Sequence, residues 1–302
     1  MVKPRTASTP KSVRYGGIEA GGTKFVLGIG QGPDRIEHRT EIPTLGPAET
    51  LAAALDWLKG RGEIAALGIA SFGPVDLDPV SPTWGYITNT TKPGWSHTNL
   101  ARAFGAALGV RIGFDTDVNG AAIAEAKWGA AEGCASSVYL TVGTGIGGGA
   151  VVNGQALHGA GHPEMGHIRV VRHPDDRDFA GICAFHGDCC EGLASGPAIL
   201  ARYGASLSAL LGDHPAHEMI AWYLAQLTHN VQAVLAPERI VMGGGVMKTP
   251  GLLDRVRAAA TSMANGYFEQ SPQHIIVGPG LGDNAGLTGA FALAAHAARE
   301  PQ

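Results

Sequence analysis

The stretch VRYGGIEAGGTKFVLGIG, residues 13–30, contains two short apolar runs separated by the turn Gly-Gly-Thr-Lys. Apolar runs on either side of a glycine turn are typical of a β-hairpin. The same arrangement returns in SVYLTVGTGIGGG, residues 137–149, with Gly-Thr-Gly as its turn. Two hairpins of one kind, each opening one half of a 302-residue chain, favour two α/β domains that face a shared site.

Both turns offer backbone amides and hydroxyl groups that suit a phosphate. The first places the amides of Gly22 and Thr23 beside the ammonium group of Lys24, and the second offers Thr144 and Gly145. Successive backbone N–H groups often form such an anion cradle. A single glycine turn is a weak indication, because a plain hairpin with a solvated lysine has the same sequence. Two such turns in one chain favour a polyphosphate site.

The remaining elements follow from apolar runs and helical periods. The expected elements are helices over residues 48–59 and 98–108, strands over 64–71 and 110–114, an Ala-rich helix after Gly120 that ends near Trp128, helices from 191 to about 235, a strand over 237–247 and a long C-terminal helix. The last strand ends on three glycines, so Gly244 and Gly245 offer a third place where backbone can approach a ligand. A plain strand-to-helix turn is the alternative.

Two aspartates stand where a strand passes into a helix, in the run FDTDVNG at residues 114–120. One of them is expected to cap the helix by accepting hydrogen bonds from its first amides. The other is free to point past the end of the strand, where open α/β sheets bind ligands. A carboxylate there can accept a proton from a hydroxyl that attacks phosphorus. We therefore predict Asp117 as a general base and Asp115 as its support.

Thiols and imidazoles gather in the stretch HPEMGHIRVVRHPDDRDFAGICAFHGDCCE, residues 162–191. Cys183, His186 and Cys189 have the spacing C-x-x-H-x-x-C around a tight turn, which suits a zinc ion but is one ligand short. A zinc ion with four protein ligands has no open position for water, so this zinc would be structural. The chemistry is then expected to come from elsewhere in the chain.

The fourth ligand is expected to be a nearby histidine. His167 is the first choice, because EMGH sets a carboxylate and an imidazole close together just before an apolar run. His162 and His173 are the alternatives. A different interpretation treats Cys189 and Cys190 as small buried hydrophobic residues, as free cysteines commonly are. The polar, glycine-rich character of the loop favours the metal.

Composition limits the partners. The formal charge is −4 and the pI is near 6.3, which gives no basic surface for nucleic acid or anionic membrane. The basic segment at residues 1–12 lacks the apolar core of a signal peptide and is expected to be a flexible tail. Four cysteines, clustered as these are, fit a reducing compartment. These features predict a cytoplasmic protein that binds neither nucleic acid nor membrane.

One polar loop has groups that suit a sugar. The segment SPTWGYITNTTKPGWSHTNL, residues 81–100, is rich in aromatic and turn residues. Asn89, Thr90 and Thr91 supply amide and hydroxyl groups of the sort that hydrogen-bond a polyol. The same residues would serve equally well in an ordinary surface loop.

Taken together, the motifs resemble the ROK family of sugar kinases and repressors, in order over nearly the whole chain from Val13. The motifs are EAGGTK at 19–24, DVN at 117–119, TVGTGIGGG at 141–149, EMGH at 164–167, the C-x-x-H-x-x-C loop, GGGV at 243–246 and GDNAGLTGA at 282–290. Within the family the chain looks most like the bacterial fructokinases. His186 stands where many ROK glucokinases have another cysteine, and HGDCCEGLASGP is similar to the fructokinase loop.

The resemblance implies an actin-like ATPase (ribonuclease H-like) α/β fold with two domains around a cleft. The small domain would cover residues 13–116, the large domain with the zinc loop residues 117–286, and a C-terminal helix at about 287–302 would pack back on the small domain. A homodimer is also a family expectation.

The resemblance also implies the site residues by matching position. The ATP phosphates would lie at Gly22, Thr23, Lys24, Thr144 and Gly145, and adenosine near Gly244 and Gly245. The sugar would lie by Asn89, Asp117, Glu164 and His167. Zinc would be bound by His167, Cys183, His186 and Cys189, so that His167 serves both the metal and the sugar site.

The reaction implied is transfer of the γ-phosphoryl group of ATP to a hexose with Mg²⁺, and D-fructose to fructose 6-phosphate is the first choice. The first phosphate turn of the family usually begins with an Asp that helps to position magnesium, whereas this chain has Glu19, as some fructokinases do. Glucokinase, mannokinase, N-acetylhexosamine kinase and a non-catalytic sugar-binding protein are the alternatives. A repressor needs a helix-turn-helix module before the first turn, and about fifteen residues are too few for one.

Overall fold

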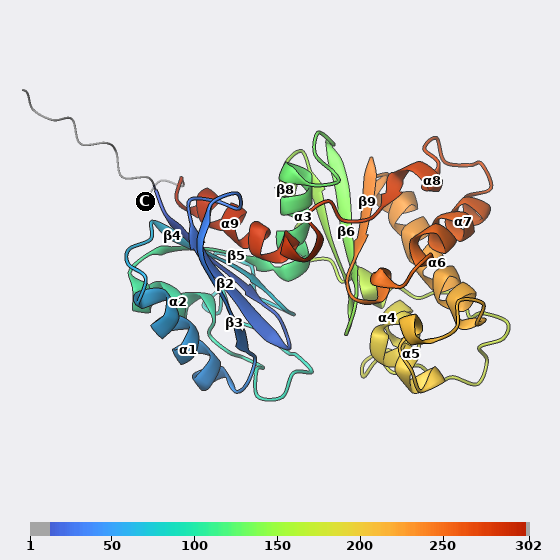
Figure 1. The fold of residues 1–302 in the computed structure, drawn as a ribbon, viewed down its shortest axis with the longest axis horizontal. Helices are drawn as coiled ribbons and strands as arrows, with labels where there is room; N and C mark the ends of the chain where they lie inside the picture. Colours follow the sequence, from blue (N-terminus) through green and yellow to red (C-terminus); the bar gives the residue numbers. More distant parts are fainter. Residues whose placement is uncertain (1–12, 300–302) are drawn as a thin grey trace, which may run out of the picture.

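The computed structural model describes residues 13–299, so the flexible tail expected at residues 1–12 lies outside the described residues. Within residues 13–299 the chain forms two five-stranded sheets (Figure 1). The first has the order β3-β2-β1-β4-β5 and the second the order β10-β9-β6-β7-β8. In each sheet three consecutive strands form an antiparallel meander, and two later strands add in parallel beside the first of them. The repeated hairpin therefore marks a repeated sheet topology.

The strands have these bounds: β1 Tyr15–Ala20, β2 Lys24–Gly30, β3 Ile36–Pro43, β4 Ala66–Ser71, β5 Arg111–Thr116, β6 Ser136–Val142, β7 Ile146–Val152, β8 Gln155–Ala156, β9 Arg239–Gly243 and β10 Ile276–Val277. The α-helices are α1 Pro47–Lys59, α2 Ala101–Leu108, α3 Asp117–Trp128, α4 Cys190–Ala194, α5 Gly196–Tyr203, α6 Ala216–Leu235, α7 Leu252–Ala264, α8 Pro272–Ile275 and α9 Ala285–Ala297. Short 3₁₀ helices cover Met165–His167, Leu207–Ala209, Val246–Lys248 and Gly282–Asn284.

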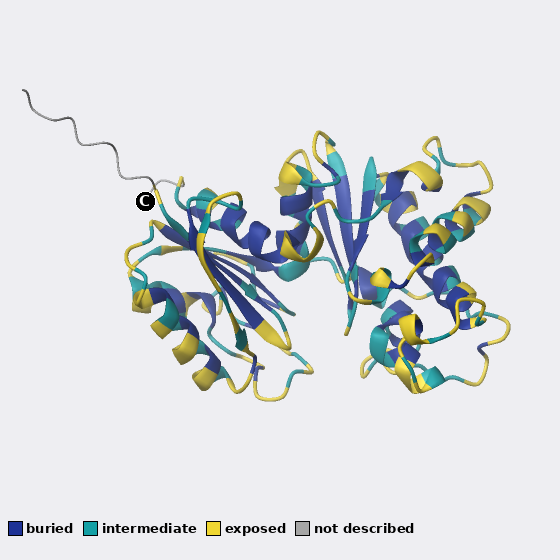
Figure 2. Cartoon of the chain, viewed as in Figure 1, coloured by how far each residue is buried: buried dark blue, intermediate teal, exposed yellow. Residues whose placement is uncertain are grey.

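Both hairpins expected from the sequence are confirmed. β1 and β2 pair antiparallel with Ala20 opposite Phe25, and β6 and β7 pair with Val142 opposite Ile146. The glycine turns stand at the ends of these pairs. Strand β4 is buried along its whole length, as its continuous apolar run predicts, because the sheet is covered on both faces (Figure 2).

The helices form layers around the two sheets. Helices α1 and α2 pack on one face of the first sheet, while α9 packs against β1, β4 and β5 on the other (Figure 1). Helix α3 lies between α9 and the second sheet, whose far face is covered by α6 and α7. No helix among the described residues is long and apolar enough to cross a membrane.

The α3–α9 pair joins the two halves at close range. A methyl group at Gly289 would overlap the backbone of Gly120, and one at Gly68 would overlap the carbonyl oxygen of Ala290. Glycine at these positions therefore lets α9 approach both α3 and the first sheet. This contact brings the N-terminal ends of α3 and α9 toward the same cleft.

Candidate active site and metal cluster

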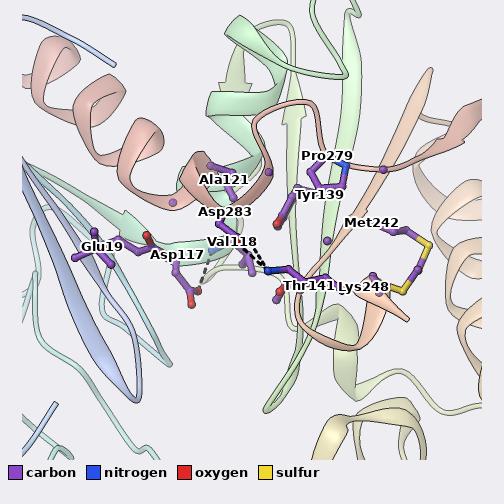
Figure 3. Close-up of a pocket in the computed structure, with 18 of the residues that line it drawn as sticks. Glu19, Asp117, Val118, Ala121, Tyr139, Thr141, Met242, Lys248, Pro279 and Asp283 are labelled. Atoms are coloured by element: carbon purple, nitrogen blue, oxygen red, sulfur yellow. Dashed lines mark hydrogen bonds and ion pairs between the residues drawn. The ribbon is translucent and has the colours of Figure 1, made fainter. Parts of the chain in front are cut away.

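A cleft of about 780 Å³ lies where β1–β3, the N-terminal ends of α3 and α9, and the carboxyl end of β9 meet. Its lining includes Glu19, Lys24, Arg39, Asp117, Val118, Tyr139, Thr141, Met242, Gly244, Lys248, Asp283 and Gly286. Figure 3 shows Glu19 and Asp117 next to each other, with Thr141 across the cleft from them. Among the residues predicted to bind sugar or ATP, Lys24, Asp117 and Gly244 therefore line the cleft. The others lie outside its lining: Gly22, Thr23, Asn89, Thr144, Gly145, Glu164, His167 and Gly245.

Thr44, just after β3, holds the first glycine turn. Its N–H donates to the carbonyl of Thr23 at 2.9 Å, and its hydroxyl donates to the carbonyl of Gly21 at 2.7 Å. Because Thr44 is only 6% exposed, both bonds are shielded from water. The exposed residues Gly22 and Thr23 thus form the tip of a turn that is fixed from within its own half of the chain.

The second glycine turn is held by a distant segment. The N–H of Gly143 donates to the carbonyl of Gly145 at 2.8 Å and closes the turn. Glu191 Oε2 then accepts from the N–H of Ile146 at 2.9 Å, and the N–H of Gly196 donates to the carbonyl of Gly143 at 2.8 Å. Glu191 lies in α4 and Gly196 begins α5, so the segment that follows the cysteine-rich loop fixes this turn.

The third glycine run packs against the second turn. Gly244 has φ +94°, and a Cβ there would overlap the backbone of Val142. Glycine is therefore required both by the left-handed backbone and by the close approach. Gly245, the next residue, is exposed. The second turn and residues 243–245 form one continuous backbone surface at the edge of the second sheet.

Charged pairs stand on both rims of the cleft. Lys24 Nζ lies 2.8 Å from Glu41 Oε2, and Arg39 lies 2.9 Å from the other oxygen of Glu41. These hydrogen bonds lower the pKa of Glu41. On the opposite rim, Lys248 Nζ lies 2.7 Å from Asp283 Oδ1. Because exposed pairs of this kind contribute little to stability, both lysines are free to exchange their carboxylate for a phosphate.

Asp117 is the first residue of α3, and its carboxylate points into the cleft (Figure 3). The helix is capped by Thr116, whose hydroxyl accepts from the N–H of Asn119 at 3.1 Å. The N-cap position is therefore held by Thr116 and by neither aspartate, although Asp117 Oδ1 does accept from the N–H of Val118, in the first turn of the helix, at 2.8 Å. Burial, together with the charges of Glu19 and Glu164, raises the pKa of Asp117 to about 7 against backbone N–H bonds that lower it. A carboxylate with this pKa is suited to take a proton near neutral pH.

Asp115 lies beneath the first turn of α3 and is 3% exposed. It accepts from the N–H of Thr116 at 2.8 Å, from Asn119 Nδ2 at 2.7 Å and from His158 Nε2 at 3.0 Å. The hydrogen bond to this carboxylate raises the pKa of His158. Asp115 thus joins the end of β5, the start of α3 and the loop after β8, and so fixes the backbone that carries Asp117.

Glu19 is the next-to-last residue of β1 and lines the cleft. Burial raises the pKa of Glu19, while the charges of Lys24 and Arg39 and a hydrogen bond from the N–H of Leu287 lower it. The bond to Leu287 places the carboxylate at the N-terminal end of α9. Glu19 and Asp117 therefore form a pair of carboxyl groups with raised pKa values on one side of the cleft.

Glu164 and His167 approach the same region from the second half. Glu164 Oε2 lies 4.0 Å from His167 Nε2, and its side chain is 46% exposed. The charge of Glu164 contributes to the raised pKa of Asp117, so the three predicted sugar residues come together. Asn89, the fourth, is an exposed residue of the loop between β4 and α2.

Four side chains form a compact cluster beside Glu164. His167 Nδ1 lies 3.4 Å from Cys189 Sγ, 3.7 Å from Cys183 Sγ and 3.2 Å from His186 Nδ1. All four ligand atoms lie within 4.8 Å of one another. Tetrahedral zinc with ordinary bond lengths separates nitrogen from sulfur by about 3.6 Å and two nitrogens by about 3.3 Å. The donor set therefore fits a zinc ion with four protein ligands.

The turn that carries the cluster is closed by its own backbone. Cys183 and Gly187 exchange hydrogen bonds of 3.1 and 2.9 Å, and Gly187 has φ +63°. Cys190, next to the cluster in sequence, points into the core, where its Sγ lies 3.9 Å from the carbonyl oxygen of Tyr223. The interpretation of a small buried hydrophobic residue thus fits Cys190, whereas Cys189 is equally buried but has its Sγ beside His167 in the cluster.

The other two candidate histidines do not belong to the cluster. His162 Nε2 accepts a hydrogen bond from the N–H of Val75 at 3.1 Å. The ring of His173 packs edge-on against Trp222.

Sequence reasoning overlooked several residues around the site. Thr44 had no recognisable signal. Glu191 directly follows the paired cysteines, so its position beside a metal motif was a usable indication. Lys248 follows the third glycine run, and Asp283 stands within the motif GDNAGLTGA.

Comparison with known proteins covers nearly the whole chain. The model of the ROK family matches residues 15–297. The chain is 50% identical over 288 residues to a fructokinase of Zymomonas mobilis subsp. mobilis, covering 93% of this chain and 96% of that relative. It is 44% identical over 287 residues to a putative fructokinase of Bacillus subtilis, covering 93% and 95%. A crystal structure of a ROK family glucokinase from Streptomyces griseus, in complex with glucose and AMPPNP, matches with a TM-score of 0.73 at 25% identity, covering 94% and 99%.

The structural match includes both sheets, and it confirms the expected actin-like fold of two α/β domains around a cleft. The family match begins at β1 and ends at the last residue of α9, so it includes both glycine turns, Asp117 and the cysteine–histidine cluster. The chain therefore belongs to the ROK family.

Proposed function

We propose that this protein is an ATP-dependent fructokinase that converts D-fructose to fructose 6-phosphate. The observation that carries the proposal is the position of Asp117, which lies in the cleft near Glu164, with a pKa raised to about 7. A base for a sugar hydroxyl needs this location and this proton affinity. The 50% identity to a fructokinase favours fructose over glucose, which is bound in the more distant glucokinase at 25% identity.

The proposed reaction is in-line transfer of the γ-phosphoryl group, in which the protein contributes position and charge. Asp117 takes the proton of the attacking hydroxyl, and Asn89, Glu164 and His167 hydrogen-bond the sugar. The ATP phosphates are held by Gly22, Thr23, Lys24, Thr144 and Gly145, and adenosine lies by Gly244 and Gly245. Mg²⁺ bound with ATP would neutralise phosphate charge, and Glu19 offers a carboxylate oxygen of the kind that this hard cation prefers.

The metal role we propose for His167, Cys183, His186 and Cys189 is a structural zinc site. The distances among their ligand atoms support it, because they fit tetrahedral coordination. Such a zinc ion would fix the loop that carries Glu164 and the start of α4.

The domain bounds and the oligomeric state that we propose are those implied by the resemblance to the family. Residues 13–116 would form the small domain, with α9 packed on it, and residues 117–286 the large domain. We also infer a cytoplasmic homodimer, on the resemblance alone. Light scattering of the purified protein measures the mass and tests the dimer.

The function is tested by steady-state ADP release with Mg²⁺ and ATP over fructose, glucose, mannose and N-acetylated hexosamines, before and after zinc is stripped. A strong preference for fructose that falls on metal removal supports both the reaction and the structural metal. Preference for another hexose corrects the substrate, and no turnover with any sugar in zinc-replete protein rejects the kinase in favour of a sugar-binding protein.

A further inference from the structure

His162 stands between the two halves of the molecule. Its side chain is 9% exposed, and its Nε2 accepts a hydrogen bond of 3.1 Å from the N–H of Val75, which follows β4 in the first half. Its Nδ1 lies 3.4 Å from Glu164 Oε1 in the second half. The ring also packs on Gly73, where an added Cβ would be 3.6 Å from His162 Cε1. One imidazole therefore contacts both halves at once.

The contact to Val75 determines which ring nitrogen carries the proton. A backbone N–H can only donate, so Nε2 must be the acceptor. In a neutral imidazole the other nitrogen, Nδ1, then holds the hydrogen, and it faces the carboxylate of Glu164. His162 thus presents a donor to Glu164 whose direction is fixed by the backbone of the opposite half.

Glu164 receives a second ring on its other oxygen. His167 turns its Nδ1 toward Cys189 and Cys183, and its Nε2 lies 4.0 Å from Glu164 Oε2. Each carboxylate oxygen of Glu164 therefore has one histidine beside it. His167 is anchored by the cysteine cluster, and His162 is anchored by Val75.

We infer that His162 is a positioning residue for Glu164. Because His162 is held by Val75, the position of the Glu164 carboxylate at the sugar site depends on how the first half of the molecule lies relative to the second. The inference rests on the proposed function, because it takes Glu164 as a sugar ligand. His162 acts through Glu164 and not on the reacting atoms, so its loss should weaken the binding of the sugar more than that of ATP.

Two substitutions of His162 each keep one of its two polar contacts and remove the other. In His162→Asn the amide nitrogen takes the place of Nδ1 and can donate to Glu164, but the side chain is too short to reach Val75. In His162→Gln the amide oxygen takes the place of Nε2 and can accept from Val75, while the donor toward Glu164 is lost. His173→Gln is the matched control, because His173 belongs to the same segment but packs on Trp222.

The measurements are KM for fructose, KM for ATP, kcat, and the dissociation constant of fructose by calorimetry without nucleotide. His162→Gln should raise the KM and dissociation constant of fructose on the order of tenfold, with the KM for ATP unchanged. His162→Asn keeps the donor but loses the contact to Val75, so it should raise both values by an intermediate factor of about threefold, and the control should match the wild type. Unchanged fructose binding in His162→Gln overturns the inference. So does a wild-type dissociation constant in His162→Asn, because the contact to Val75 would then have no part in positioning Glu164.

A measurement on the wild type keeps the test independent of folding and of the reaction. A long-range ¹H–¹⁵N spectrum should show His162 with its proton on Nδ1, and a proton on Nε2 contradicts the inference. Absence of turnover in the wild type with the expected tautomer rejects the proposed function and the sugar role of Glu164 together. Normal turnover with an unaffected His162→Gln variant rejects the inference alone.

Discussion

The two glycine turns have the same sequence arrangement but different supports. Thr44, a neighbour of β3 in the same sheet, holds the carbonyls of the first turn. The second turn is held by Glu191 and Gly196, about fifty residues further along the chain. The local sequence therefore fixes the shape of each turn. The tertiary contacts of the turn determine which other parts of the molecule can change that shape.

The support of the second turn begins at the cysteine–histidine cluster, which is the proposed zinc site. Cys189 is the N-cap residue of α4, and Glu191 lies two residues further on in the same short helix. A displacement of Cys189 should therefore move the carboxylate that accepts from Ile146. The first turn has no such link, because its support comes from β3. Loss of the metal should consequently affect one turn and leave the other in place.

The largest effect is expected from a substitution of Asp117, which tests whether the two turns serve one reaction centre. Asp117 lies between Glu19, near the first turn, and Glu164, near the cluster, so Asp117→Asn should remove the base without disturbing either turn. Turnover should fall by ~10²–10⁴, while the KM for ATP stays close to that of the wild type. Steady-state ADP release measures both values, and an enzyme that keeps most of its kcat removes Asp117 from the role.

Removal of the proposed zinc ion should give the clearest difference in behaviour between the two turns. Chelation, or Cys183→Ser, opens the four-ligand cluster and should cost several kcal/mol, which corresponds to a fall in Tm on the order of 10 °C. Amide hydrogen exchange should rise at residues 143–146 and stay unchanged at residues 21–24. The comparison between the turns fails if both segments respond alike or if neither does.

A smaller change should loosen the second turn with the metal still in place. Glu191→Ala leaves the N–H of Ile146 without its acceptor, and loss of a hydrogen bond to a charged group costs ~1.5–3 kcal/mol of stability. Because the loosened turn is a proposed phosphate site, kcat/KM should fall clearly below that of the wild type. Glu41→Ala is the control, because it removes a carboxylate from an exposed pair with Lys24 beside the first turn and should change kcat/KM by less than about threefold. Equal losses of kcat/KM in the two variants would show that the negative charge of these carboxylates matters, and not the hydrogen bond of Glu191 to the second turn.

The contributions of Asp117 to activity and to stability should change with pH in opposite directions. The folded-state pKa of Asp117 is raised to about 7, so the folded protein binds this proton more tightly than the unfolded chain does. The contribution of this carboxyl group to stability is then greatest below the ordinary aspartate pKa and falls as the pH rises toward 7. Over the same range kcat/KM rises, because the base becomes ionised. Thermal unfolding should give Asp117→Asn a higher Tm than the wild type at pH 8 and a smaller difference at pH 5. A constant difference contradicts this account.

The parts of the structure that sequence predicted are those with a strong local pattern. The two hairpins, the buried strand β4, Asp117 and the C-x-x-H-x-x-C turn each depend on residues close together in the chain. Strand β3 was not predicted, because it is an edge strand with mostly exposed side chains and little apolar alternation. The contacts made by Thr44 and Glu191 were missed for another reason. They join segments that only the tertiary fold brings together.

The smallest expected effect concerns the support of the first turn. Thr44→Val removes the hydroxyl that donates to the carbonyl of Gly21 but keeps the backbone bond to Thr23 and nearly the same volume. One hydrogen bond of this kind contributes about 1 kcal/mol, so Tm should fall by roughly 2–4 °C. Thr44→Ser keeps the hydroxyl and is the matched control. Hydrogen exchange should increase at residues 21–24 only. An increase at residues 143–146 as well would mean that the two turns share a support after all, and that the metal cluster is not the sole route by which a distant change reaches the second turn.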